Sequence, residues 1–183
     1  MKRFSLIFVF FLLSCVNPFS PREPEQPSTP SGHYEIPTSP EKLVSNLYWS
    51  YSDRNLANFS TVLSDSFVFS ASAEDSLANP ELFAFWNCSV ELDVTGRMFQ
   101  SGYVYLELSI SEDFEDYIGE ETANLYREYI LIVEGSSATS SAPAEGVALF
   151  ELEKEDNDWW HLVHWTDIPS SSVSWADVKS EFR

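Results

Sequence analysis

The stretch Asp158–Asp167, near the C-terminus, constrains the fold more than any other part of the chain. It contains three of the six tryptophans and two of the three histidines, and its aromatic and β-branched content is typical of a strand. Because side chains alternate along a strand, strict alternation predicts two faces. One face carries Trp160, Leu162, His164 and Thr166, and the other carries Trp159, His161, Val163, Trp165 and Asp167. With tryptophan on both faces, we expect one face to cover a core and the other to meet a second layer or a partner.

The composition indicates one globular domain with a strongly acidic surface. The chain has 183 residues, 44% of them hydrophobic and 15% aromatic, which is sufficient for a well-developed core. Acidic residues number 29 against 10 basic ones, giving a formal net charge of -19. Such a surface repels phosphate backbones, so we expect no nucleic-acid partner.

Residues 1–14 are interpreted as a bacterial lipoprotein signal peptide. Met1-Lys2-Arg3 precedes an apolar run from Phe4 to Leu13, which is shorter than the roughly twenty residues of a membrane span and fits a secretory signal. The run ends in Leu12-Leu13-Ser14-Cys15, which resembles a lipobox. This resemblance implies cleavage before Cys15 and acylation of its sulfur, and two or three acyl chains anchor a protein stably. An ordinary signal peptide with a chance cysteine is the alternative.

A proline-rich tether is predicted for residues 15–39. Seven of the ten prolines lie within residues 16–40, and such a segment forms an extended spacer rather than a core. We therefore expect a domain held at the bacterial cell envelope by acylated Cys15. The residue after Cys15 is Val16 and not the aspartate that would resemble an inner-membrane retention signal. This difference favours a location on the periplasmic side of the outer membrane.

After the tether, the hydrophobic period changes from helical to extended along the chain. The expected helices span about residues 40–53, with Ser39 as N-cap, then 56–63 and 89–99, with a further helix start at Asn79-Pro80-Glu81. The expected extended segments span about residues 65–70, 103–110, 125–134, 146–153 and 158–167. Helices first and strands after is the pattern of an α+β domain with an antiparallel sheet packed against helices.

The order of these elements resembles the nuclear-transport-factor-two-like superfamily, which includes SnoaL-like and ketosteroid-isomerase-like proteins. The matching segments are Leu43–Asp53, Phe59–Phe69 and the final strand, where Trp160-His161-Leu162-Val163-His164-Trp165 is similar to the family's aromatic pattern. The tail Ser174–Lys179 resembles a short terminal helix of lipoprotein members. The resemblance implies that residues 40–168 form a cone, with N-terminal helices packed in the concave face of a curved antiparallel sheet, and that a tail follows at 169–183.

The same resemblance implies a cavity inside the cone for a small apolar ligand. Six residues are predicted to line it: Tyr51, Phe67, Trp86, Phe150, Trp160 and His164. His164 is then a candidate general base beside a carboxylate such as Asp65 or Glu128, and the alternative is a hydrogen-bonded interior or rim histidine. No standard catalytic, metal or nucleotide motif is present, so no catalytic residue, metal site or cofactor is assigned.

The outward strand face leaves two alternatives open. Its members Trp159, His161 and Trp165 are a predicted interface for a second copy or an envelope protein. In the other interpretation, the C-terminal tail covers this face through Val173, Trp175 and Val178.

Two further features could form sites, an acidic segment and a cysteine. Glu112–Glu121 has six carboxylates in ten residues, and a solvated loop is favoured over a calcium site because the spacing does not match an EF-hand. Cys88 has no intramolecular partner if Cys15 is acylated, so we expect a small buried hydrophobic residue.

These observations lead to two hypotheses about function. The first is a lipid-anchored, non-catalytic module of the cell envelope that binds a small apolar ligand or a protein partner. The alternative is a small-molecule isomerase, dehydratase or hydrolase that uses His164 and a pocket carboxylate.

Overall fold

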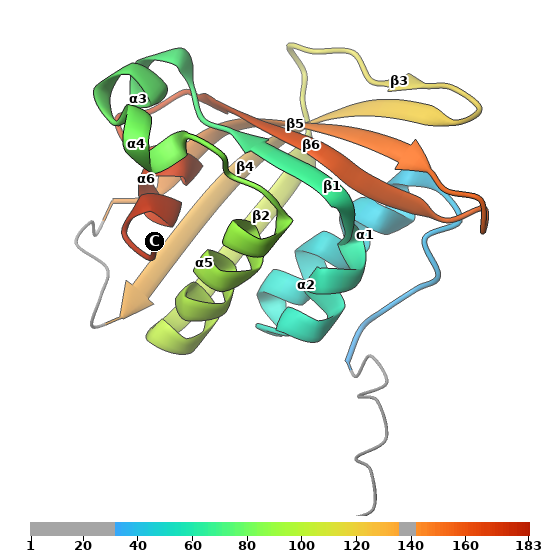
Figure 1. Cartoon of the computed structure of the whole chain (residues 1–183), viewed down its shortest axis with the longest axis horizontal. Coiled ribbons are helices and arrows are strands. Elements are labelled where there is room, and N and C mark those ends of the chain that lie inside the picture. The colour runs from blue at the N-terminus through green and yellow to red at the C-terminus, as the bar shows by residue number, and fades with distance from the viewer. Residues whose placement is uncertain (1–31, 136–141) are drawn as a thin grey trace, which may run out of the picture.

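The computed structural model describes residues 32–135 and 142–183. The predictions for the signal peptide, for Cys15 and for the tether up to residue 31 lie outside the described residues. The helices of the described part are α1 Pro40–Ser52, α2 Leu56–Val62, α3 Ala73–Ala78, α4 Pro80–Phe83, α5 Cys88–Ser101 and α6 Trp175–Ser180 (Figure 1). The strands of the same part are β1 Leu63–Ser70, β2 Gly102–Ile110, β3 Tyr117–Ile118, β4 Thr122–Gly135, β5 Ala144–Lys154 and β6 Trp160–Pro169.

The strands form one curved sheet with the order β1-β6-β5-β4-β2, and β3 pairs with β4 beside this path. β1 runs parallel to β6, and the other pairs are antiparallel. We call the side that packs against the helices the concave face and the opposite side the outer face. In Figure 1 the helices α2 and α5 lie in front of the sheet, over its concave face. The predicted α+β class with helices against a curved sheet is confirmed.

Polar caps fix where the longer helices begin. The side chain of Ser39 accepts a hydrogen bond from Lys42 N at the start of α1, and Pro40 occupies the first turn. Asn87 caps α5 in the same way through Val90 N. Each cap satisfies an amide of the first helical turn that has no partner within the helix.

One hydrophobic core joins the concave face of the sheet to the buried sides of α1, α2, α5 and α6. Gly96 in α5 shows how closely the helices pack, because a Cβ atom at this position would lie 3.0 Å from Leu56 Cδ2 of α2. The glycine that weakens the helical pattern of α5 in the sequence therefore has a packing role.

A β-bulge in β6 changes which of its side chains face the core. Glu151 pairs with His164, but the next residue of β5 pairs with Leu162, so Val163 is an extra residue on β6. An extra residue moves every later side chain to the opposite face. The core side of β6 holds Trp160, Leu162, Trp165 and Asp167, each at most 4% exposed. The predicted strict alternation is therefore wrong beyond Val163.

The structure also contains elements that the hydrophobic pattern did not predict. The short helix α3 has no buried residue, and β3 consists of two exposed residues within the acidic segment. Asn79 precedes α4 but makes no side-chain capping bond. Elements without a buried face leave no periodic signal in a sequence.

Residues 32–39, which the sequence analysis placed in the tether, lie against the domain. Asn46 of α1 is 1% exposed and binds the backbone of Glu35 twice, at 2.9 Å and 2.6 Å. Trp160 N donates to Pro37 O at 2.9 Å. The folded unit therefore includes residues before position 40.

Among the described residues, no helix is both long and apolar enough to cross a membrane.

Candidate functional site

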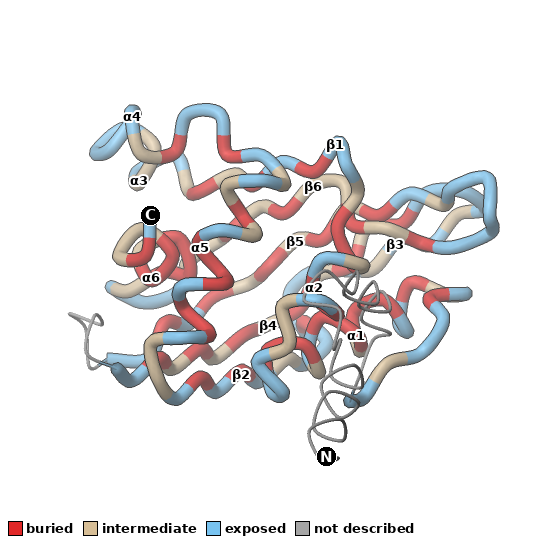
Figure 2. Tube along the Cα trace, turned by 60° about the horizontal axis from the view of Figure 1, so that its bottom comes forward, coloured by how far each residue is buried: buried red, intermediate tan, exposed pale blue. Residues whose placement is uncertain are grey.

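The C-terminal tail fills the concave side of the sheet. Six of its residues are buried: Ser174, Trp175, Ala176, Val178, Lys179 and Phe182. The Trp175 ring lies 4.4 Å from that of Trp165 and 4.9 Å from that of Tyr129, measured between ring centroids. Figure 2 accordingly shows α6 as mostly buried. The tail thus occupies the space in which the family resemblance implies a ligand.

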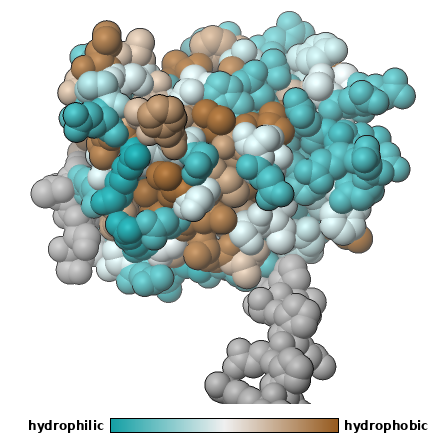
Figure 3. Space-filling view, in the orientation of Figure 1, coloured by the Kyte–Doolittle hydropathy of each residue, from teal (hydrophilic) through white to brown (hydrophobic). Residues whose placement is uncertain are grey.

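The surface around the tail is apolar. In Figure 3, apolar side chains gather in the left half of the view, where α5 and α6 lie in Figure 1. Hydrophilic side chains dominate the right end, toward the turn between β5 and β6. The apolar surface in this view is thus concentrated over the half of the molecule that holds α5 and α6.

A fully buried ion pair connects the tail to α5. Glu91 of α5 and Lys179 of α6 are both 0% exposed, and Lys179 Nζ lies 2.9 Å from Glu91 Oε1 and 3.1 Å from Oε2. The carboxylate also accepts hydrogen bonds from Trp86 Nε1 at 2.8 Å and from Thr95 Oγ1 at 3.2 Å. Burial lowers the pKa of Lys179, and the negative charge of Glu91 opposes that shift. The pair joins the end of the chain to the centre of the cone.

A second buried polar group holds the start of α6. Asp167 accepts hydrogen bonds from Tyr129 Oη and from Ala176 N, both at 2.7 Å. Trp175 N donates to Tyr129 Oη at 3.0 Å. Burial raises the pKa of Asp167, against the opposing effect of these hydrogen bonds, and burial also raises the pKa of Tyr129. Sequence reasoning did not select Glu91, Asp167 or Tyr129 as site residues.

Five of the six predicted pocket residues lie in the core: Tyr51, Phe67, Trp86, Phe150 and Trp160, each at most 4% exposed. Burial, with the charge of Glu91 as a smaller cause, raises the pKa of Tyr51. Ligand binding by these residues stays a prediction.

His164, the sixth predicted pocket residue, lies on the outer face. The bulge at Val163 turns its side chain out of the cone, where it is 36% exposed. Its Nε2 lies 2.8 Å from Ser70 Oγ, and its Nδ1 contacts the carboxylate of Glu151. The predicted partners Asp65 and Glu128 are not its contacts. The expectation that His164 looks into the cone is therefore wrong.

Serine, histidine and carboxylate in this order form the chain of contacts that activates a nucleophile in hydrolases. Here the three residues come from adjacent strands β1, β6 and β5. The outer face has a hollow across β2, β4 and β5, and none of the three residues lines it. Each of their contacts crosses from one strand to the neighbouring strand. The arrangement supports cross-strand bonding more directly than catalysis.

The three predicted interface residues occupy different environments. Trp159 is 38% exposed just before β6, and His161 is partly buried near Glu155. Trp165 is 0% exposed and packs against Trp175. The tail thus covers Trp165 as one alternative expected, but it does so on the concave face. The outer face is not covered by α6.

A hollow of about 360 Å³ lies on the outer face across β2, β4 and β5. Four carboxylates line it: Glu107, Asp113, Glu128 and Glu145. Ile130 and Val147 contribute apolar surface between them, and no lysine or arginine is among the lining residues. Glu128 is held by Glu112 N at 3.1 Å. The hollow therefore combines apolar surface with unbalanced negative charge.

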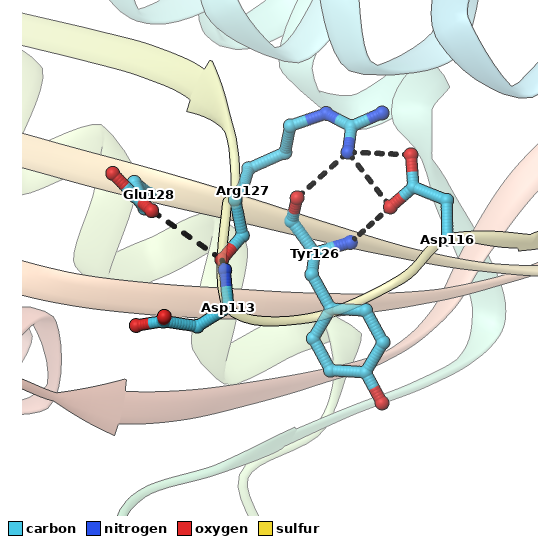
Figure 4. A network of polar contacts seen from close by, with 6 residues as sticks. Asp113, Asp116, Tyr126, Arg127 and Glu128 are labelled. Carbon is cyan, nitrogen blue, oxygen red and sulfur yellow. Dashed lines mark hydrogen bonds and ion pairs between the residues drawn. The ribbon is translucent and has the colours of Figure 1, made fainter.

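The neighbouring loop is organised by an ion pair (Figure 4). Asp116 accepts hydrogen bonds from Arg127 Nη1 at 2.9 Å and 2.8 Å and from Tyr126 N at 2.8 Å. Phe114 stacks on Tyr126 with ring centroids 4.9 Å apart. This ordering fixes the position of Asp113 at the rim of the hollow.

Within residues 32–135 and 142–183, no three His, Cys, Asp or Glu side chains are placed to hold a metal ion. Cys88 is a free thiol of intermediate exposure, and burial with the charge of Asp65 as a smaller cause raises its pKa.

Structural comparison identifies the fold. The chain is similar to a conserved protein from Planctomyces limnophilus, with TM-score 0.57 and 12% identity over 69% of this chain and 89% of that one. It is similar to a hexachlorocyclohexane dehydrochlorinase, with TM-score 0.53 and 10% identity over 73% and 84%. A ketosteroid isomerase-like protein from Erwinia carotovora gives TM-score 0.50 and 13% identity over 76% and 99%.

In sequence, no protein-family model and no curated protein matches the chain. The structural neighbours confirm the predicted cone-shaped, nuclear-transport-factor-two-like fold. They include enzymes as well as proteins of unknown function. At these identities the likeness establishes the fold alone.

Proposed function

We propose that this chain, with its nuclear-transport-factor-two-like fold, is a lipid-anchored module of the bacterial cell envelope that binds a basic protein partner on its outer face. The observation that carries the proposal is the position of the tail. Trp175, Lys179 and Phe182 fill the concave side, where a small ligand would otherwise bind. Of the two occupants expected from the sequence, the protein partner is therefore the better supported.

The charge of the outer hollow supports a basic partner. Glu107, Glu128 and Glu145 come from three neighbouring strands, and the lining contains no cation to balance them. Two copies meeting at this hollow would bring like charges together, which opposes self-association. Complementary positive charge on a partner accelerates encounter and makes binding sensitive to salt.

The anchor is proposed from the sequence. Cys15 is the acylation site, and residues 16–31 remain as spacer once residues 32–39 are counted with the domain. An extended polyproline segment of that length reaches about 50 Å. The outer face would then meet partners at a distance from the lipid surface.

A charge-reversal experiment tests the partner proposal. The full-length protein carrying Glu107→Lys with Glu145→Lys is compared with a matched control, Glu74→Lys with Glu81→Lys on the exposed helices α3 and α4. Partners cross-linked in cells and retained at low salt are quantified by mass spectrometry. We expect at least tenfold less basic partner on the outer-face variant and no loss on the control.

Two other outcomes would argue against a basic partner at the outer face. Equal loss on both variants would reduce the effect to net charge. A native mass of two chains that is lost only in the outer-face variant would indicate self-association and overturn the proposal of a basic partner.

The anchor is tested separately. Intact-mass analysis should show acyl chains on Cys15, and Cys15→Ala should move the protein from the membrane fraction to the soluble fraction. An unacylated wild-type protein would contradict the anchor without affecting the outer-face proposal.

A further inference from the structure

The buried end of Lys179 lies in a cage of aromatic rings and a carboxylate. Its Nζ is 3.5 Å from the centroid of the Trp165 ring and 3.8 Å from that of Phe69. Both oxygens of Glu91 lie within hydrogen-bond distance of the same nitrogen. An ammonium group over aromatic faces is attracted by their ring quadrupoles, most strongly when it is desolvated.

The body of the cone supplies all of this cage except the cation. Glu91 belongs to α5, Phe69 to β1 and Trp165 to β6. Trp86 Nε1 holds the carboxylate in place, and the rings of Phe69 and Trp165 fix each other with centroids 5.8 Å apart. Two walls and the carboxylate of the cage thus come from outside the tail, although Trp165 also packs against Trp175 of the tail.

The cation comes from a short helix. α6 has six residues, and isolated helices shorter than about twelve residues are marginal in water. A short element of this kind can open locally without unfolding of the whole domain. If α6 leaves, the buried carboxylate and its aromatic walls remain without a counter-ion, which is a costly state.

The fit favours a compact cation on a narrow stem. Lys179 is 0% exposed along its whole side chain, so its four methylenes run through packed surroundings to the cage. A primary ammonium is a small point charge with rotatable donors, whereas a guanidinium is a wide planar group. The two ring contacts and the two carboxylate oxygens surround a single nitrogen.

We infer that the cage formed by Glu91, Phe69 and Trp165 is a binding site for a primary alkylammonium group on an unbranched chain, and that Lys179 occupies it as an internal ligand. An external amine competes with the tail for the cage. The site lies on the opposite side of the sheet from the outer hollow, and its tests leave the residues of that hollow unchanged.

Chemical rescue tests the site in the full-length protein. Lys179→Ala removes the atoms of n-propylammonium, and 1-propanol provides a neutral control of equal chain length. We expect n-propylammonium to raise the thermal midpoint of the variant saturably and to bind at least tenfold more tightly than 1-propanol. Adding Glu91→Gln should weaken amine binding at least tenfold. Equal effects of amine and alcohol, or no saturable effect, would overturn the inference.

The wild-type chain provides a second measurement if Lys179→Ala does not fold. Amide hydrogen exchange of residues 175–180 is followed with added 1,5-diaminopentane and, separately, with Nα-acetyl-lysine amide. Displacement of Lys179 should accelerate exchange several-fold, and the more effective compound distinguishes a free amine from a lysine side chain. Unchanged or slower exchange with both compounds would overturn the inference.

Discussion

Carboxylates occur on both sides of the sheet, but their surroundings differ. On the concave side, Glu91 and Asp167 are at most 1% exposed and contact Lys179, Trp86, Tyr129 or backbone amides. On the outer face, the four carboxylates of the hollow have no cation among the lining residues. Buried charges must be compensated within the molecule, whereas solvated charges need not be. The concave side thus compensates its buried charges internally, whereas the lining of the outer hollow does not.

The largest expected effect concerns the buried ion pair. Glu91→Ala leaves Lys179 buried without its partner, and breaking such a pair costs about 3–5 kcal/mol in the free energy of unfolding. The double variant Glu91→Gln with Lys179→Met should recover most of that loss, because it leaves no buried charge without a partner and the amide can still accept from Trp86 Nε1. Urea unfolding measures both.

The control for this experiment lies on the same helix. Asp93 pairs with Arg97 at the surface, with side chains 60% and 53% exposed. Asp93→Ala should cost no more than about 0.5 kcal/mol. Similar losses for Glu91→Ala and Asp93→Ala would contradict the contrast between buried and exposed carboxylates.

A smaller effect is expected at the hydroxyl that holds the start of α6. Tyr129→Phe removes the donor to Asp167 and the acceptor for Trp175 N, which should cost about 1–3 kcal/mol because buried polar atoms lose partners. Tyr126→Phe, on the same strand but stacked at the surface with Phe114, is the control. Faster hydrogen exchange in α6 of Tyr129→Phe alone would locate the effect at the tail.

The free energy of unfolding should also depend on pH through the buried carboxyl group of Asp167. Burial raises the pKa of Asp167 in the folded chain above its ordinary value of 3.8. Between the two pKa values, the folded state holds a proton that the unfolded state has lost, so the free energy of unfolding falls as pH rises through this window. Asp167→Asn removes this contribution.

Urea unfolding at pH steps from about 3.5 upward tests the sign. The stability of the wild type relative to Asp167→Asn should decline with rising pH. A relative stability that increases with pH would show that the hydrogen bonds from Tyr129 and Ala176 outweigh burial.

The smallest effect is expected on the outer face. Glu107→Gln should change the free energy of unfolding by no more than about 0.5 kcal/mol, as for other surface positions. Relief of repulsion between like charges favours a slight gain, which added salt should reduce. A loss above about 2 kcal/mol in urea unfolding would mean that the hollow is part of the stabilising core.

The sequence predicted the longer helices and the long strands, because each of these elements buries a periodic face, and the family resemblance implied the fold. It did not predict the arrangement of β6, because a β-bulge depends on pairing with β5 and leaves no mark in the pattern of β6 alone. That single extra residue, Val163, moved His164 out of the cone and Trp165 into it.

The buried pair was missed for a different reason. Trp175, Val178, Lys179 and Phe182 follow the spacing of one helical face, so the sequence did contain a lysine on an apolar side. Its partner Glu91 lies 88 positions away, and a contact of that separation follows only from the tertiary fold. Charged residues are mostly exposed in folded proteins, so residue type alone does not mark either as buried.

The docking of residues 32–39 determines how tension reaches the domain. Force applied through the N-terminal segment acts on the hydrogen bonds that Asn46 makes with Glu35 and that Trp160 makes with Pro37. These contacts lie on α1 and at the beginning of β6, so the load is divided between a helix and a central strand. Tension on this segment must therefore break these contacts before it can unwind the domain.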